Sequence, residues 1–133
     1  MNWDLFAQEV QDLSKKIDYH PDIIIGITRG GIIPARLLST YLNVSEMYCL
    51  TVRKIDEERK VSTEILENLV DKNILLVEDM LETGRSMIVA KKYLKSKGAK
   101  VKTACLYFMP ISEIVPDFYL REVQEVQRFP WDS

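Results

Sequence analysis

The sequence predicts an α/β protein whose doubly wound, mostly parallel sheet is flanked by helices. Short β-branched runs alternate with stretches of helical periodicity, a pattern typical of strands joined by right-handed crossovers. Small polar loops follow two of these runs, at the carboxyl ends of strands where α/β sheets bind ligands. The length of 133 residues and the hydrophobic content of 47% suit one domain, residues 1–133, with one core.

The first half of the chain is expected to contribute two helices and two strands. Apolar residues at near-helical spacing from Leu5 to Ile17 predict the first helix, and either Asn2 or Asp4 could cap it. Three further elements follow: a strand at 22–27 that is buried on both faces, a helix at 34–42 whose first turn holds Pro34, and a loosely alternating strand at 46–52.

The second half begins with residues 53–60, which are charged and lack apolar periodicity, and this predicts a mobile, solvated loop. Ile74 to Val77 is the clearest buried strand of the chain. The remaining elements are a helix at 86–97 that Gly98 ends, a strand at 100–108 and a shorter strand at 118–123.

Composition excludes several classes of protein. The net charge of −2 argues against a protein that binds nucleic acid through its phosphates, and no apolar run is long enough to span a membrane. The first residues lack the features of a signal peptide, so the cytoplasm is the expected location. Cys49 and Cys105 lack metal-type spacing and are expected to be reduced core thiols, and His20 is the single histidine.

The segment from Ile74 to Ser86 has the features of a phosphate site. A buried strand is followed by a small polar loop, Thr83–Ser86, which opens a helix whose first N–H groups lack partners. Gly84 allows close approach of the backbone to a ligand, and Thr83 and Ser86 offer hydroxyl groups. Arg85 either adds positive charge or points to solvent.

Two adjacent carboxylates, Glu78 and Asp79, stand between that strand and that loop. Carboxylates repel phosphate, so their presence indicates a ligand that also carries hydroxyl groups or a divalent cation such as Mg²⁺. A sugar with a phosphate at one end and vicinal hydroxyls fits this pattern. The alternative is a capped helix after an acidic turn.

The same segment resembles the phosphoribosyl pyrophosphate motif of type I phosphoribosyltransferases: apolar strand, two acids, two apolar residues, an acid, Thr, Gly, any residue and Ser. The resemblance implies catalytic roles for Glu78, Asp79 and Glu82. Glu78 and Asp79 would hold the ribose hydroxyls and Mg²⁺, and residues 82–86 would hold the 5′-phosphate. Glu82 stands where purine-using members often have an Asp that approaches the base.

Residues Thr28, Arg29, Gly30 and Gly31 form the second polar loop. Two glycines let backbone N–H groups turn toward an anion, and Arg29 adds a charged donor. An ordinary glycine turn is the alternative. The loop resembles the family's pyrophosphate loop, most closely that of small bacterial and archaeal xanthine-guanine, or purine, phosphoribosyltransferases, which makes Thr28–Arg29 a candidate for a cis peptide.

The resemblance also implies a lid, a base pocket and a short C-terminal hood. Arg59 or Lys60 in the charged stretch would reach the pyrophosphate, although the family's Ser-Tyr pair is replaced by Lys54-Ile55. Met109 stands where relatives have a Lys that reads the 6-oxo group. In the hood, Trp131 would cover the base or simply pack at the end of the fold, and Val126 replaces a stacking aromatic residue.

The resemblance thus implies a Mg²⁺-dependent enzyme that transfers phosphoribosyl from phosphoribosyl pyrophosphate to a nucleobase, with a purine as the expected acceptor. The family commonly forms homodimers, and apolar residues of 34–42 would suit an interface. The alternative function is a non-catalytic sensor that binds phosphoribosyl pyrophosphate or a nucleotide and regulates a partner. A receiver-like signalling domain would need acids at 26–28, where this chain has Gly-Ile-Thr.

Overall fold

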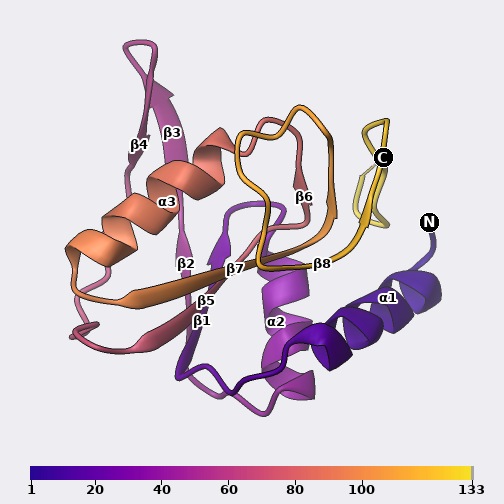
Figure 1. The fold of residues 1–133 in the computed structure, drawn as a ribbon, viewed down its shortest axis with the longest axis horizontal. Coiled ribbons are helices and arrows are strands. Elements are labelled where there is room, and N and C mark those ends of the chain that lie inside the picture. The colour runs from indigo at the N-terminus through magenta and orange to yellow at the C-terminus, as the bar shows by residue number, and fades with distance from the viewer. Residues whose placement is uncertain (133) are drawn as a thin grey trace.

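The computed structural model describes residues 1–132 and has a central sheet with helices on both faces (Figure 1). The elements in chain order are α1 (Trp3–Lys16), β1 (Ile23–Ile27), α2 (Ile32–Tyr41), β2 (Met47–Leu50), β3 (Val52–Ile55), β4 (Glu58–Val61), β5 (Asn73–Val77), β6 (Met80–Leu81), α3 (Arg85–Ser96), β7 (Lys100–Phe108) and β8 (Phe118–Glu122).

The main sheet confirms the expected fold class. Its order is β2-β1-β5-β7-β6, β8 also pairs with β7, and every pair in it is parallel. The strands β1 and β5 are neighbours in register, with Gly26 opposite Val77. The loops that leave their carboxyl ends therefore meet at one edge of the sheet.

The alternation of side chains along β1 and β5 divides the core into two halves. Ile23, Ile25 and Ile27 pack with Ile74 and Leu76 beneath α3. Ile24 packs with Leu75 and Val77 beneath α1 and α2. Both strands are thus buried on both faces, which is why their sequences are continuous apolar runs.

The charged stretch is a hairpin, so the prediction of an irregular loop at 53–60 was wrong. The strands β3 and β4 pair antiparallel, and the turn residues Asp56 and Glu57 both have positive φ, of 50° and 67°. Asn-Gly and Asp-Gly are the pairs that usually form such a turn, so the Asp-Glu pair of this chain did not predict one. At the base of the hairpin Val52 and Val61 pack against the core beneath α3, which stabilises it despite its charged tip.

Smaller differences concern element ends and the cysteines. Asn2, rather than Asp4, caps α1, because its Oδ1 accepts a hydrogen bond of 2.8 Å from the Leu5 amide. Cys105 is buried as expected, whereas Cys49 is half-buried. Within residues 1–132, no helix combines the length and apolar character needed to cross a membrane.

The C-terminal segment, residues 123–132, forms the hood, and an aromatic cluster joins it to α1. The ring of Phe6 in α1 meets Phe129 and Trp131 edge-on, with centroids 6.1 and 4.9 Å away. Phe129 lies stacked between Trp131, at 5.0 Å, and Tyr107 of β7, at 5.7 Å. The position of the hood therefore depends on burial of Phe6, which has no exposed surface.

Truncation of Phe6 is expected to destabilise the protein strongly. Phe6→Ala removes a fully buried ring from the cluster and should lower the free energy of unfolding by about 3–5 kcal/mol. Leu5→Ala is the matched control, because Leu5 is 49% exposed and should lose less than about 1 kcal/mol. Urea denaturation measures both values, and equal losses would contradict the described packing.

Candidate functional site

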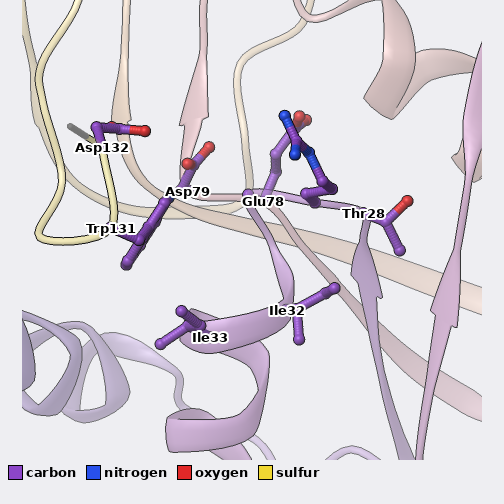
Figure 2. A pocket seen from close by; sticks show the side chains of 9 residues that line it. Thr28, Ile32, Ile33, Glu78, Asp79, Trp131 and Asp132 are labelled. Atoms are coloured by element: carbon purple, nitrogen blue, oxygen red, sulfur yellow. The ribbon is translucent and has the colours of Figure 1, made fainter.

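A cavity of about 670 Å³ lies beyond the carboxyl ends of β1 and β5. Its lining combines the loop after β1, the start of α2, the two acids after β5 and the hood: Thr28, Arg29, Gly30, Ile32, Ile33, Glu78, Asp79, Trp131 and Asp132. Figure 2 shows Glu78 and Asp79 side by side, with Thr28 toward one end and Asp132 toward the other. The structure thus brings together the two polar loops that the sequence singles out.

A smaller hollow of about 200 Å³ adjoins this cavity at Glu78 and is lined by Met80 to Ser86. Gly84 has a φ of 77° and precedes the first turn of α3, whose free N–H groups face this loop. A Cβ on Gly84 would lie 2.7 Å from the Ile114 side chain, so glycine is needed for both conformation and space. The loop fits a phosphate group.

The side chain of Arg85 turns away from this loop. Its Nε donates a 2.6 Å hydrogen bond to Glu113, and the Glu113 amide donates to the Thr83 carbonyl oxygen at 2.8 Å. Arg85 thus lines the edge of the hollow with its charge paired to Glu113, and its contact with a phosphate stays a prediction. The backbone amides, Thr83 and Ser86 remain as the donors.

The loop after β1 contacts the acids directly. Its Thr28–Arg29 peptide is cis, as the resemblance suggested. A Cβ on Gly30 would lie 2.6 Å from the Asp79 carboxyl carbon, so only glycine permits this approach. The Thr28 hydroxyl forms a 2.8 Å hydrogen bond with that of Thr51, which ties the loop to the end of β2.

Glu78 and Asp79 are unusual acids because both are held in a poorly solvated place. Burial, with a contribution from the Asp79 charge, raises the pKa of Glu78 to about 8. Burial and the nearby Asp132 raise the pKa of Asp79 to about 6, although its hydrogen bond from the Met80 amide acts in the opposite direction. A bound cation would relieve this repulsion.

The raised pKa of Glu78 predicts a pH-dependent cost in stability. Between its ordinary value of 4.5 and about 8, the folded state retains a proton that the unfolded state releases, so the free energy of unfolding falls as pH rises through this window. The side chain of Glu78→Gln cannot ionise. The melting temperature of this variant should therefore rise relative to that of the wild type as pH increases from 5 to 8.

Differential scanning calorimetry of the unliganded protein measures this difference. Glu122→Gln, at an exposed position at the end of β8, is the control and should follow the wild-type pH dependence. If the melting temperatures of Glu78→Gln and the wild type depend on pH in the same way, burial of the Glu78 carboxylate does not lower the stability of the wild type.

Arg59, Lys60 and Met109 are predicted site residues that line neither the main cavity nor the hollow at residues 80–86. Arg59 lines a separate hollow beside α3 with Arg85 and Glu113, and Lys60 forms an exposed 3.9 Å ion pair with Glu58. Both are carried by the β3–β4 hairpin, which packs against α3. Met109 follows β7, where its amide donates to the Leu81 carbonyl oxygen, and it does not line the main cavity.

Trp131 has both of the roles that the sequence left open. It packs at the end of the fold against Phe6 and Phe129, and it also lines the cavity. Sequence reasoning missed three cavity residues, Ile32, Ile33 and Asp132. The Pro-Trp-Asp run at the end of the chain was the available signal for Asp132.

Glu78 and Asp79 are the side chains of this site that could hold a magnesium ion. Two carboxylates suit this oxygen-seeking cation, which usually keeps several waters and takes further ligands from substrate phosphates. Among residues 1–132, no group of three or more His, Cys, Asp and Glu side chains is arranged to hold a metal. Glu78 and Asp79 therefore fit Mg²⁺ that arrives with a substrate.

Comparisons with known proteins agree with this geometry. A purine phosphoribosyltransferase structure from Pyrococcus horikoshii Ot3 superposes with a TM-score of 0.93, is 33% identical, and is matched over 100% of this chain and 92% of its own. A xanthine-guanine phosphoribosyltransferase of Idiomarina loihiensis is 30% identical over 116 residues, which are 82% of this chain and 70% of the relative.

A second xanthine-guanine phosphoribosyltransferase, from Desulfotalea psychrophila, is 27% identical over all of this chain and 85% of its own length. The model of the phosphoribosyl transferase domain family matches residues 2–133. Because this family model covers nearly the whole chain and the fold is the same, the chain belongs to the phosphoribosyltransferase family.

Proposed function

We propose that this phosphoribosyltransferase moves the 5-phosphoribosyl group from phosphoribosyl pyrophosphate to a purine base, releases pyrophosphate and serves purine salvage. The observation that carries the proposal is the position of Glu78 and Asp79 between two anion-binding loops. A ribose bound there has its 5′-phosphate at Thr83–Ser86 and its pyrophosphate at Thr28–Gly31. The names of the relatives reported above support a purine as the acceptor.

The residues of this chain have distinct tasks in that reaction. A base nitrogen forms a bond to ribose C1 while the bond from C1 to the pyrophosphate oxygen breaks, and the base loses a proton. Glu78 and Asp79 hold the ribose hydroxyls, Arg29 and the loop amides stabilise the departing pyrophosphate, and Glu82 lies toward the base. Bound Mg²⁺ supplies further stabilisation of the leaving group's charge.

The lid and the base-side residues complete the proposal. Arg59 and Lys60 reach the pyrophosphate only if the β3–β4 hairpin moves from α3 over the cavity, as lids of enzymes do. Trp131 covers the base side of the cavity, and Met109, which follows β7 and does not line this cavity, has no side-chain donor for an oxo group. We also propose the cytoplasm as the place of action.

We also propose a homodimer, but its interface is not the one expected from residues 34–42. In α2, Pro34, Ala35 and Leu38 are buried in the core, and Leu37 and Leu42 pack partly against it. Tyr41 is the large apolar residue of this segment left markedly exposed, at 36%, and the exposed Arg36 and Thr40 are polar. The segment is apolar because it covers its own sheet, and light scattering would measure the oligomeric state.

Release of pyrophosphate tests the proposed function. Wild-type protein with phosphoribosyl pyrophosphate, Mg²⁺ and each of several purine and pyrimidine bases should release pyrophosphate with a purine, and chelation by EDTA should abolish the release. The retained acids and loops favour this result over the non-catalytic alternative. Binding of phosphoribosyl pyrophosphate without release for any base would support the sensor instead.

A further inference from the structure

A charged side chain lies on the buried face of α1. Glu9 is only 6% exposed and lies on the same face of the helix as the fully buried Phe6 and Leu13. A buried carboxylate is rare in proteins and destabilises the fold unless other groups pair with it. Glu9 does not line the main cavity, so contact with a substrate gives no reason for its burial.

Tyr107 of β7 and Arg121 of β8 pair with this carboxylate. The buried Tyr107 hydroxyl donates a hydrogen bond to Glu9 Oε2, and Arg121 Nη2 donates to Glu9 Oε1. Arg121 reaches the carboxylate from the surface, also donates to the Tyr107 hydroxyl at 3.2 Å, and lies 4.8 Å from the centre of the Tyr107 ring. The Glu9–Tyr107–Arg121 network therefore fixes both the hydroxyl and one face of this ring.

The Tyr107 ring begins the aromatic stack of the hood, which returns beside α1 (Figure 1). Its plane lies 13° from that of Phe129, and the plane of Phe129 lies 5° from that of Trp131. Trp131 in turn lines the main cavity. Because the three rings pack nearly parallel, movement of the Tyr107 ring must loosen or tilt Trp131.

The backbone of Tyr107 contacts the acid side of the same cavity. The Asp79 carbonyl oxygen accepts hydrogen bonds from the amides of Leu106, at 3.0 Å, and Tyr107, at 3.4 Å. Tyr107 thus connects the segment that carries Asp79, through its backbone, with the hood, through its side chain.

We propose that Tyr107 is a positioning residue, held by Glu9 and Arg121, that sets the place of Trp131 at the base side of the cavity. The effect on kinetics rests on the proposed transferase function. Tyr107→Phe keeps the ring and removes the hydroxyl, so it should loosen the hood without changing a group that contacts the reacting atoms.

Kinetics of pyrophosphate release measures the effect on substrate binding. In Tyr107→Phe, KM for the purine should rise about five- to tenfold, as expected for the loss of one hydrogen bond. The values of kcat and of KM for phosphoribosyl pyrophosphate should change less than about twofold, because the phosphate loops and the acids are unaltered.

Fluorescence of Trp131 measures the position of the hood without any substrate. The chain has two tryptophans, so Trp3→Phe leaves Trp131 as the single indole and keeps an aromatic ring at position 3. In this background Tyr107→Phe should raise the constant for acrylamide quenching about twofold, because a loosened hood opens locally to solvent. Glu9→Gln weakens the network from its other end and should shift both measurements in the same direction.

Tyr119→Phe is the matched control. It removes a hydroxyl from β8, but Tyr119 packs beneath α3 and not in the hood, so quenching and KM should remain at the wild-type values. Thermal melting selects a temperature at which each variant is folded.

The two measurements separate this inference from the function on which it rests. Unchanged quenching of Trp131 in folded Tyr107→Phe and Glu9→Gln would overturn the inference, whatever the activity. Increased quenching with an unchanged KM for the purine would also overturn the positioning role. A wild type that releases no pyrophosphate with any base would instead refute the transferase function, and quenching would still test the network.

Discussion

Asp79→Asn is expected to lower kcat/KM for pyrophosphate release by about 100- to 1,000-fold. The variant keeps the shape of the side chain and its contact with Gly30, but it removes the charge that accepts ribose hydroxyls and attracts Mg²⁺. The effect should be large because the carboxylate lines the main cavity beside Gly30.

The control for Asp79→Asn is Glu122→Gln, which removes one negative charge from an exposed position at the end of β8. It should retain wild-type activity. Circular dichroism and thermal melting check that Asp79→Asn is folded. Because the variant loses a buried negative charge beside Glu78, its melting temperature at pH 8 should not fall below that of the wild type. Near wild-type activity in folded Asp79→Asn would contradict the role assigned to this acid.

Gly30→Ala is expected to lower kcat/KM by at least about 100-fold, although it adds a single methyl group. That methyl would lie 2.6 Å from the Asp79 carboxyl carbon, so either the pyrophosphate loop or the acid must move. A displacement of this size separates the donors of Arg29 and the loop amides from the leaving group. Kinetics of pyrophosphate release measures the loss.

Gly98→Ala is the matched control for this glycine. Gly98 ends α3 with a φ of 88°, far from the site, and alanine there should cost about 1 kcal/mol of stability through backbone strain. Its activity should remain that of the wild type. If Gly30→Ala loses no more activity than Gly98→Ala, the close packing of loop and acid is not important for catalysis.

Much of the fold could be predicted from the sequence because its central strands have a clear apolar pattern. Residues 23–27 and 74–77 are continuous apolar runs, and burial on both faces leaves few alternatives to a central parallel strand. The hairpin at 52–61 was missed because its strands are charged and its turn lacks glycine. Its stability depends on contacts of Val52 and Val61 with distant residues beneath α3, which no local pattern shows.

In the site, too, local motifs predicted some residues, whereas long-range packing positions the others. Glu78, Asp79 and the loops at 28–31 and 83–86 were predictable, because each lies in a short local motif at the end of a strand. The place of Asp132 was not, since the aromatic stack of Phe6, Phe129 and Trp131 is what brings the end of the chain back over the cavity. The distance of Arg59 from the cavity likewise depends on how the hairpin packs.

The central claim is that the paired acids and two loops bind phosphoribosyl pyrophosphate for transfer to a base. The most direct measurement is detection by mass spectrometry of the nucleoside 5′-monophosphate formed from phosphoribosyl pyrophosphate, Mg²⁺ and a mixture of guanine, xanthine, hypoxanthine and adenine. The wild type should form at least one such nucleotide, and Asp79→Asn should form almost none. Absence of any nucleotide from a wild-type protein that binds phosphoribosyl pyrophosphate in calorimetry would contradict the claim.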